Sequence, residues 1–544
     1  MKFFQKSPFF WLSLLSGLLL SVAWPHIGSL SPLIFVALVP LLIIEDHVFQ
    51  KKYRGRKVFF SAWLSFFVFN TCTTWWIWFS TDVGMALAII LNSLFMAIVF
   101  WFFHFTKKKV GKKEGYISLF IYWLCFEYLH YSWELSWPWL TFGNVFANDV
   151  EFIQWYEYSG TAGGTLWIIL VNVLWFIIIR NIYWLKTETW KTQNRKTVFA
   201  LSVILLPCIF GYVMYLNYEE TSNPADIVLV QPNIDPYNEK FVNGTGDQQM
   251  EKFLSLAKQK MDDKVDFLVG PETQLPFSVL ENFIDSVREI KQLRTFMQDY
   301  PGTRFITGMS SYRVFKKEET DSETARPVEG AEEYVYDSYN AAFQMVKNEP
   351  IQIYHKSKLV LAVEKVPFAG WFPFLEKLAL DLGGTVGSLG VQEEPSVFTS
   401  DLNPQHVIAP AICYESIYGE YITKYVQKGA TLIFIITNDG WWDNTPGHKQ
   451  HMAYARIRAI ENRRSIARCA NTGVSCFINQ RGDVIEKTTW WEPAVIRQTI
   501  NANDELTLYS KTGDIIGRTA GFVSILLVML TFAKALMRKK PGEL

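Results

Sequence analysis

Three polar residues each follow directly on a short apolar segment, and their types suit acyl transfer. Glu272 stands in a Gly-Pro-Glu-Thr turn, Lys356 follows Ile-Tyr-His, and Cys413 follows Pro-Ala-Ile. A carboxylate can take a thiol proton, the thiolate can attack a carbonyl carbon, and an ammonium can stabilise the resulting oxyanion. Because a thiol with a pKa near ~8.5 is mostly protonated at neutral pH, it needs such a base and cation nearby. The combination predicts a cysteine nucleophile served by a glutamate and a lysine.

Each of these residues also has an ordinary structural interpretation. A cysteine at the end of an apolar strand is more often a small buried hydrophobe, and a single strand-end glutamate or lysine is usually a cap or a solvated charge. Lys358, two residues after Lys356, competes for the role of the cation. Spacing alone does not decide between the structural and the catalytic interpretation.

The elements that must position these residues are strands of an α/β domain. Between residues 217 and 510, short runs rich in Val and Ile alternate with amphipathic stretches, as in strands interleaved with helices. The predicted strands are Asp226–Gln231, Val265–Val269, Arg304–Thr307, Ile351–Tyr354, Val407–Cys413, Thr431–Thr437 and Ser475–Asn479. The predicted helices are Asp247–Met261, Val279–Asp299, Ile417–Gln427 and His448–Arg464. The polar segment 316–333 predicts a mobile surface loop.

The first third of the chain has the composition of a membrane protein. Only 19% of the 544 residues are charged, and 16 of the 21 tryptophans lie between Trp11 and Trp190. Several apolar runs there approach the ~20 residues that a helix needs to cross a bilayer. We expect eight spans, seven before the α/β domain and one after it: Phe9–Trp24, Pro32–Ile44, Val58–Phe79, Met85–Phe105, Tyr116–Ser132, Thr165–Trp184, Val198–Leu216 and Ile515–Leu536.

The distribution of charge predicts the orientation of these spans. Residues 1–216 carry 17 basic and 10 acidic side chains, residues 217–510 carry 29 and 40, and residues 511–544 carry 6 and 2. The basic residues fall in alternate loops, which places the N-terminus in the cytoplasm and the acidic central domain outside. A cleavable signal peptide over the first apolar run is disfavoured, because losing that helix would break the alternation. The three ranges are the predicted domains.

Composition and cysteine spacing exclude several other classes of protein. Half of the residues are apolar, which excludes disorder, and the formal net charge of zero argues against nucleic-acid binding. The chain contains no Cys-x-x-Cys motif, so neither a disulfide framework nor a zinc site is expected. We expect the remaining cysteines to be packing residues: Cys72, Cys125, Cys208, Cys469 and Cys476.

The order of Glu, Lys and Cys, with the residues around them, resembles the nitrilase superfamily of carbon–nitrogen hydrolases. Seven spans before such a domain and one after it resemble the apolipoprotein N-acyltransferase family. The most specific motifs are Val230-Gln231-Pro232-Asn233-Ile234, Gly270-Pro271-Glu272-Thr273, His355-Lys356-Ser357-Lys358-Leu359-Val360, Ile412-Cys413-Tyr414-Glu415 and Thr437-Asn438-Asp439-Gly440-Trp441-Trp442. The fold implied is a polytopic α-helical membrane domain with an inserted nitrilase-like αββα sandwich.

The resemblance also implies roles for individual residues. Glu272 corresponds to the general base, Lys356 to the oxyanion-stabilising cation and Cys413 to the nucleophile. Lys356 fits the family motif better than Lys358 does. The supporting residues implied are Glu364, Tyr414 and Glu415. The substrate-binding residues implied are Phe241, which replaces a family tryptophan, and Trp441 and Trp442, which with Asp439 form part of the site wall.

The reaction implied has two steps and needs no cofactor or metal. The cysteine takes an acyl chain from a membrane phospholipid, and the amine of a diacylglyceryl-cysteine apolipoprotein then accepts it. The implied location is the bacterial inner membrane, with a monomeric multi-pass chain and its catalytic domain on the periplasmic side. The apolar segment Pro367–Leu375 is either an arm dipping into the membrane interface or an ordinary core segment.

Two other functions remain open from the sequence. A membrane-anchored amidase or nitrilase would use the same three residues with water as the acceptor, but it would not need eight spans. A transporter or scaffold should carry ionisable residues within its spans. Such residues are few here, and Glu127 is the clearest.

Overall fold

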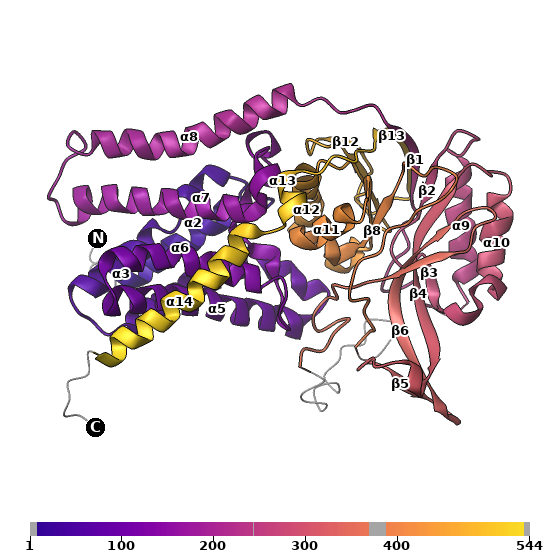
Figure 1. Ribbon diagram of the computed structural model, residues 1–544, viewed down its shortest axis with the longest axis horizontal. Coiled ribbons are helices and arrows are strands. Elements are labelled where there is room, and N and C mark those ends of the chain that lie inside the picture. The colour runs from indigo at the N-terminus through magenta and orange to yellow at the C-terminus, as the bar shows by residue number, and fades with distance from the viewer. Residues whose placement is uncertain (1–7, 243, 369–387, 538–544) are drawn as a thin grey trace. The chain divides into compact units, whose positions relative to one another are not determined.

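The computed structural model describes residues 8–242, 244–368 and 388–537, so most of the predicted arm Pro367–Leu375 lies outside the described residues. The chain divides into two compact units, which are described separately. The first unit contains residues up to Trp78, residues Asp82–Asn217 and the residues from Thr512 onward. The second contains Phe79–Thr81 and Tyr218–Lys511. Figure 1 shows the helices and strands with the labels used below.

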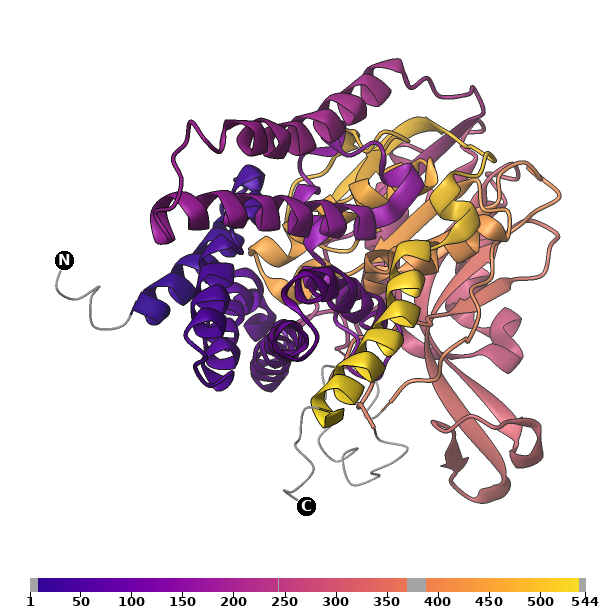
Figure 2. The same cartoon turned by 60° about the vertical axis from the view of Figure 1, so that its left-hand side comes forward.

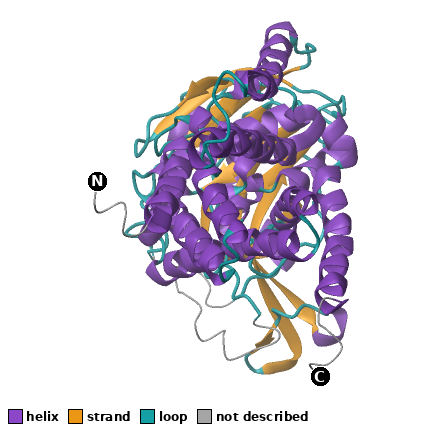
Figure 3. Cartoon of the chain, turned by 90° about the vertical axis from the view of Figure 1, so that its left-hand side faces the viewer, coloured by secondary structure: helices purple, strands orange, loops and turns teal. Residues whose placement is uncertain are grey.

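The first unit is helical (Figure 3). Its main α-helices are α2 (Pro8–Ala23), α3 (Val39–Gln50), α4 (Arg56–Thr74), α5 (Asp82–Lys109), α6 (Lys112–Leu129), α7 (Tyr156–Ile179), α8 (Asn194–Asn217) and α14 (Ile515–Met537). Among the described residues, five segments are long and apolar enough to span a membrane: Ser31–Gln50, Asp82–Lys109, Tyr156–Trp184, Asn194–Asn217 and Ile515–Met537. The chain is therefore a multi-pass membrane protein.

The other three predicted spans coincide with α2, α4 and α6, which are shorter or less apolar. Helix α2 has 16 residues, α4 has 19 and α6 has 18. Helix α4 ends at Thr74, where a 3₁₀ helix, η2 (Trp75–Phe79), replaces the last turn of the predicted third span. The eight-span count consequently stays a prediction.

Helix α8 is poorly buried, and a hydrogen bond near its internal proline attaches it to α7. Pro207 has no backbone N–H, so the carbonyl of Val203, four residues earlier, loses its helical partner. The indole Nε1 of Trp167 on α7 donates to this carbonyl at 2.7 Å. The bond ties α8 to α7 at the point where the α8 backbone is incomplete.

Ionisable side chains do lie inside the helical unit, and they are paired with one another. Lys107 Nζ lies 2.5 Å from Glu45 Oε2 and 3.5 Å from Asp46 Oδ1, and His104 Nδ1 lies 2.7 Å from Glu45 Oε1. Arg180 Nη1 lies 3.6 Å from Asp46 Oδ1. Of the ionisable residues inside spans, the sequence clearly indicated Glu127. The others lie near the ends of predicted spans, where charged residues are expected in the adjoining loops.

The second unit contains two β-sheets. The eight-stranded sheet has the order β13-β1-β2-β4-β6-β5, with β3 on β4 and β7 on β6, and the five-stranded sheet has the order β12-β11-β10-β9-β8. The strands of the first are β1 (Pro224–Gln231), β2 (Phe267–Val269), β3 (Leu275–Leu280), β4 (Arg304–Lys316), β5 (Arg326–Val328), β6 (Ala331–Met345), β7 (Gln352–His355) and β13 (Ala494–Asn501). Those of the second are β8 (Ile408–Ile412), β9 (Leu432–Thr437), β10 (Ile466–Ala470), β11 (Cys476–Ile478) and β12 (Val484–Lys487).

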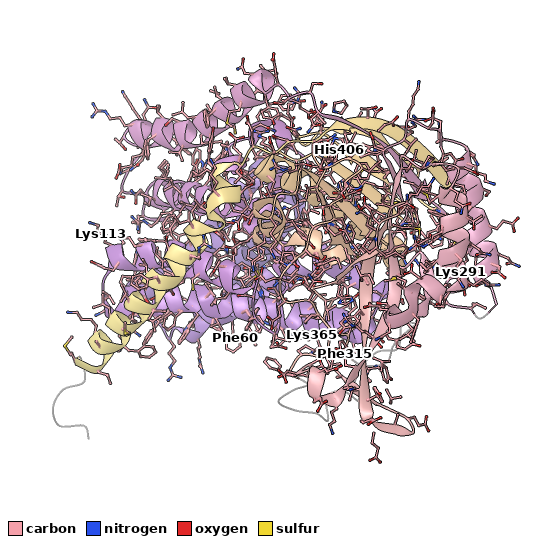
Figure 4. All side chains as sticks on the ribbon, turned by 45° about the vertical axis from the view of Figure 1, so that its right-hand side comes forward. Phe60, Lys113, Lys291, Phe315, Lys365 and His406 are labelled. Atoms are coloured by element: carbon pink, nitrogen blue, oxygen red, sulfur yellow. The ribbon has the colours of Figure 1, made fainter. Side chains whose placement is uncertain are left out.

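Helices cover the outer faces of the two sheets. The apolar sides of α9 (Gly246–Lys258) and α10 (Arg288–Met297) pack on the first sheet in one buried core, while charged side chains of α10 such as Lys291 point outward (Figure 4). Helices α11 (Gly419–Gln427) and α12 (Pro446–Asn462) lie on the side of the second sheet (Figure 1). Phe267 of β2 and Phe434 of β9 meet edge to face at 5.2 Å, so the inner faces of the sheets pack together. The unit is thus a four-layer αββα arrangement.

The seven predicted strands all occur, with ends that differ by one or two residues except for β4. Two other predictions need correction. The predicted helix Val279–Asp299 begins as the end of β3 and a 3₁₀ helix, η7 (Glu281–Ser286), and only its second half forms α10. The predicted loop 316–333 contains β5 and the start of β6, which with β4 form a ribbon that extends from the sheet (Figure 2).

Candidate active site

The three candidate catalytic residues each lie just beyond a strand. Glu272 lies in the turn after β2, Lys356 follows the last residue of β7, and Cys413 follows β8 and begins the 3₁₀ helix η10 (Cys413–Ile417). A Cβ atom on Gly308 of β4 would lie 2.6 Å from the backbone nitrogen of Thr273 and 2.8 Å from Cα of Glu272. Glycine at this position therefore gives the Glu272 turn the room it needs.

Lys356 lies between two carboxylates. Its Nζ donates to Glu272 Oε1 at 3.2 Å and to Glu364 Oε1 at 2.8 Å, and the side chain is 1% exposed. Burial by itself lowers the pKa of Lys356, but the charges of Glu272 and Glu364 outweigh it and raise that pKa above its ordinary value. The residue is thus an ammonium at neutral pH. Within the described residues, its third N–H and Glu272 Oε2 have no hydrogen-bond partner.

Asn340 of β6 joins the two carboxylates and was not identified from the sequence. Its Nδ2 donates to Glu272 Oε1 and to Glu364 Oε1, each at 2.8 Å. Its backbone carbonyl accepts from the backbone N–H of Lys356 at 2.9 Å. Glu364 Oε2 in turn accepts from the backbone N–H of Val360 at 2.8 Å. One asparagine therefore fixes the spacing of the base, the cation and the second glutamate.

Cys413 has a strained backbone and a buried thiol. Its φ of 51° lies in the left-handed region, which costs a residue other than glycine roughly 1–2 kcal/mol. Burial raises the pKa of the thiol well above its ordinary value, and the charge of Glu272 raises it further, while Lys356 opposes both. The thiol is therefore protonated at rest and depends on a base to become a nucleophile.

Glu415 connects the lysine loop with the nucleophile strand. Its Oε1 accepts from the backbone N–H of Ser357 at 2.7 Å and from the Tyr354 hydroxyl at 2.6 Å. Its Oε2 accepts from the backbone N–H of Ile412 at 2.8 Å. Burial raises the pKa of Glu415, and these hydrogen bonds oppose that shift. The carboxyl group of Glu415 thus links the backbone next to Lys356 with the backbone next to Cys413.

The other residues named from the sequence lie around this centre. Tyr414 is buried and meets the Tyr418 ring edge to face at 5.3 Å. Lys358 Nζ lies 5.4 Å from the centre of the Tyr418 ring and 5.5 Å from that of Tyr421. It is Lys356, two residues earlier, that contacts the carboxylates.

The predicted substrate-binding aromatics make two separate sets of ring contacts. Phe241 and Trp441 are half-buried and stack with centroids 6.3 Å apart, and Tyr237 meets Trp441 edge to face at 5.1 Å. Trp442 instead meets the His451 ring edge to face at 5.6 Å. Asp439, predicted as part of the site wall, is fully buried and bonded to His451 and Arg468. Its charge acts on the Cys413 thiol, and its place in the site wall stays a prediction.

Lys240 is a second buried lysine that the sequence did not indicate. It is 2% exposed, and its Nζ donates to the backbone carbonyl of Glu272 at 2.9 Å. Burial lowers its pKa to about 7, against the smaller opposing effect of Glu272. Lys240 therefore ties the loop that carries Phe241 to the turn that carries Glu272. A lysine beside the Phe241 position is the only sequence signal it offers.

The arrangement suits acid–base and nucleophilic chemistry performed by side chains. Among the described residues, none bonds to Glu272 Oε2 or to the third N–H of Lys356, and the Cys413 thiol interacts electrostatically with both side chains. Across the parts of the chain that the structure describes, no group of three His, Cys, Asp or Glu side chains could hold a metal ion.

Comparisons with known proteins cover both units. A family model described as the apolipoprotein N-acyltransferase N-terminal domain matches residues 16–174, and a carbon–nitrogen hydrolase model matches residues 227–505. Among solved structures, a Saccharomyces cerevisiae member of branch 10 of the nitrilase superfamily is 12% identical. It covers 55% of this chain and 96% of its own, with a TM-score of 0.36.

Two curated relatives extend over nearly the whole length. The apolipoprotein N-acyltransferase of Chlorobaculum tepidum is 32% identical over 97% of this chain and 97% of its own. The enzyme of the same name from Geobacter metallireducens is 26% identical over 93% of this chain and 91% of its own. These matches confirm the resemblance drawn from the sequence motifs. The chain belongs to the apolipoprotein N-acyltransferase family, with that family's N-terminal domain followed by a carbon–nitrogen hydrolase domain.

Proposed function

We propose that the protein transfers an acyl chain from a membrane phospholipid, through a thioester on Cys413, to the N-terminal amine of a diacylglyceryl-cysteine apolipoprotein. The observation that carries this proposal is the position of Lys356 Nζ, 3.2 Å from Glu272 and 2.8 Å from Glu364, with one N–H that no described residue accepts. An ammonium held by two carboxylates cannot easily turn away, so its open N–H offers a fixed positive charge to a developing oxyanion.

In the first half-reaction, Glu272 takes the proton from the Cys413 thiol and the sulfur attacks the ester carbonyl carbon of the phospholipid. The carbonyl oxygen becomes an oxyanion that the open N–H of Lys356 stabilises. When the tetrahedral intermediate collapses, the carbon–oxygen bond to the glycerol breaks. The departing oxygen takes the proton back from Glu272, leaving a lysophospholipid and the thioester.

In the second half-reaction, the neutral amine of the diacylglyceryl-cysteine attacks the thioester carbonyl carbon. Glu272 accepts the proton that the amine loses, and Lys356 again stabilises the oxyanion. The carbon–sulfur bond then breaks, and the sulfur regains a proton from Glu272. Because one carboxyl group serves both halves, the site returns to its starting protonation state after each cycle.

The membrane arrangement that we propose has eight spans, the N-terminus in the cytoplasm and the catalytic domain on the periplasmic side of the inner membrane. The domains would be residues 1–216, 217–510 and 511–544. Its support is the charge balance, +7 for residues 1–216 from 17 basic and 10 acidic side chains and −11 for residues 217–510 from 29 and 40. Both lipid substrates lie in the membrane, so a membrane-held nucleophile gains proximity to them.

The test uses the full-length protein in detergent and a phospholipid labelled in its acyl chain. Label should become attached to the protein and be released by neutral hydroxylamine. Cys413→Ala should show no label. Cys469→Ala should label normally, because that buried thiol donates to the backbone carbonyls of Val230 and Val269. Persistent label in Cys413→Ala would exclude Cys413 as the nucleophile.

A second arm identifies the acceptor. Adding a synthetic diacylglyceryl-cysteine peptide to the labelled enzyme should move the label into an N-acyl peptide, which mass spectrometry detects. If the label appears only as free fatty acid, water is the acceptor and the protein is a hydrolase.

A further inference from the structure

The backbone carbonyl of Cys413 is held by two side chains that the mechanism above does not use. The Ser416 hydroxyl donates to it at 2.8 Å, and His451 Nε2 lies 3.1 Å from it. Ser416 lies on η10, one turn after Cys413, and His451 lies on α12. Two separate elements thus converge on the carbonyl of the one residue at the site whose side chain is the candidate nucleophile.

Behind His451 lies a buried row of charged side chains. His451 Nδ1 is 3.0 Å from Asp439 Oδ1, and Asp439 Oδ2 pairs with Arg468. Thr437 also donates to Asp439 Oδ1, at 2.7 Å. Burial raises the pKa of Asp439, but Arg468 and His451 outweigh it and hold that pKa below its ordinary value. The carboxylate is therefore ionised and holds Arg468, whose Nη2 lies 3.1 Å from His451 Nδ1.

The contacts of His451 define where its ring proton must be. A carbonyl oxygen only accepts hydrogen bonds, so the contact with Cys413 requires a proton on Nε2, and Nδ1 then accepts from Arg468 Nη2 at 3.1 Å. Ser416 at Nε2 and the edge contact with Trp442 also hold the ring. Its side chain is 0% exposed, so water does not compete for the Nε2 proton.

We propose that His451, oriented by the Asp439–Arg468 ion pair, is a positioning residue that, together with Ser416, holds the Cys413 carbonyl and thereby aims the nucleophilic sulfur. A residue stays in the left-handed region only where its surroundings over-determine it. Fixing the carbonyl fixes the peptide plane after Cys413, and with φ at 51° this determines the direction of the Cα–Cβ bond. Without the two donors, Cys413 relaxes toward an ordinary conformation and its sulfur leaves the line of attack.

The inference rests on the proposed role of Cys413, and the experiment separates the two. The rate constant of thioester formation is measured in a single turnover with the acyl-labelled phospholipid, using the full-length chain. His451→Gln keeps a donor at the reach of Nε2, whereas His451→Asn keeps only one at the reach of Nδ1. We expect His451→Asn to lose about 10²-fold in this rate constant, the scale of a misplaced reacting group. His451→Gln should stay within about tenfold of the wild type.

A matched control is another buried histidine in the same unit. His406, labelled in Figure 4, is 2% exposed. Its Nε2 lies 3.2 Å from Asn223 Oδ1. His406→Asn should lower the melting temperature while keeping the rate constant of the folded protein. A role of His451 in stability alone would give the same result for His451→Asn, with equal rates in the Gln and Asn variants, and would overturn the proposal.

Ser416→Ala keeps the test decisive if the His451 variants do not fold. It removes the second donor from the same carbonyl, and we expect a loss of about tenfold in the rate constant with the apparent KM for phospholipid unchanged. An unchanged rate constant in Ser416→Ala would overturn the proposal. Label in Cys413→Ala would instead refute the proposed function, independently of any His451 result.

Discussion

Two buried lysines, one in each unit, have similar partners and different consequences. Lys107 in the helical unit contacts Glu45, Asp46 and the Tyr116 hydroxyl, at 2.5, 3.5 and 3.2 Å. Lys356 in the α/β unit contacts Glu272 and Glu364, at 3.2 and 2.8 Å. Each ammonium donates two hydrogen bonds, Lys107 to Glu45 and Tyr116 and Lys356 to Glu272 and Glu364, so the difference between them lies in what else surrounds the nitrogen.

The surroundings of the two lysines distinguish a structural ion pair from a reactive one. Burial and pairing with carboxylates are common to both lysines. The aromatic rings of Phe49, Phe103 and Tyr116 also surround Lys107 Nζ, at 4.6–5.8 Å. Lys356 instead follows the end of a strand and interacts with the Cys413 thiol. The thiol beside the ammonium, rather than the ion pair itself, distinguishes the candidate functional site.

Replacing Lys356 should greatly slow thioester formation. Lys356→Met removes the ammonium that contacts Glu272 and Glu364, and we expect thioester formation to fall by about 10³-fold. The measurement is the single-turnover rate with acyl-labelled phospholipid. Lys358→Met is the matched control, because Lys358 packs over tyrosine rings. Equal losses in both variants would show that the two lysines are not functionally distinct.

Replacing Lys107 should lower the stability of the protein without changing its rate of thioester formation. Lys107→Met removes the cation that Glu45 and Asp46 share, leaving His104 beside Glu45 and Arg180 beside Asp46. Breaking such a buried pair typically costs about 3–5 kcal/mol of stability. We expect a lower melting temperature in detergent and an unchanged thioester rate in the protein that remains folded. The exposed Lys108→Met is the control. A large loss of rate with no loss of stability would contradict the structural assignment.

Asn340 tests how closely the reactive pair is held. Asn340→Leu removes the amide that donates to Glu272 and Glu364, and we expect the thioester rate to fall about 10- to 10²-fold because the base is no longer fixed. Asn340→Asp keeps the shape but adds a third carboxylate, so its loss should be larger. If the isosteric Asp variant is more active than the Leu variant, Asn340 acts through its volume rather than its donors.

Lys240, with one hydrogen bond and a pKa of about 7, predicts the smallest and most pH-dependent effect. Between pH 7 and pH 10.5, which is the ordinary pKa of a lysine, the unfolded chain binds more protons at Lys240 than the folded chain does. The free energy of unfolding therefore rises with pH in this window, by about 1 kcal/mol between pH 7 and pH 8. Lys240→Met should abolish this increment.

The measurement for Lys240 is the melting temperature of the wild type and of Lys240→Met at both pH values. Their difference should change with pH, because only the wild type carries the titrating amine. An identical pH dependence in the two proteins would show that Lys240 does not titrate in this range.

Much of the fold followed from local patterns. The strands before Glu272, Lys356 and Cys413 were predicted because buried strands are continuous apolar runs. Strands β6 and β10 were missed, since β6 carries Glu332 and Asp337, and β10 carries the buried Arg468. The predicted helix Val279–Asp299 was wrong in its first half, where an amphipathic pattern continues without helical backbone. These segments depend on partners that lie far away in the sequence.

The site divides in the same way. The sequence by itself determined the residue types, their order at strand ends and the family to which they belong, because these features are local and repeat in recognisable motifs. Only the tertiary structure decided that Asn340 and Lys240 join Glu272, that Asp439 lies behind His451, and which donors stay open. Such choices depend on hydrogen bonds between elements distant in sequence, and a lone polar residue carries no local sign of the partner it will meet.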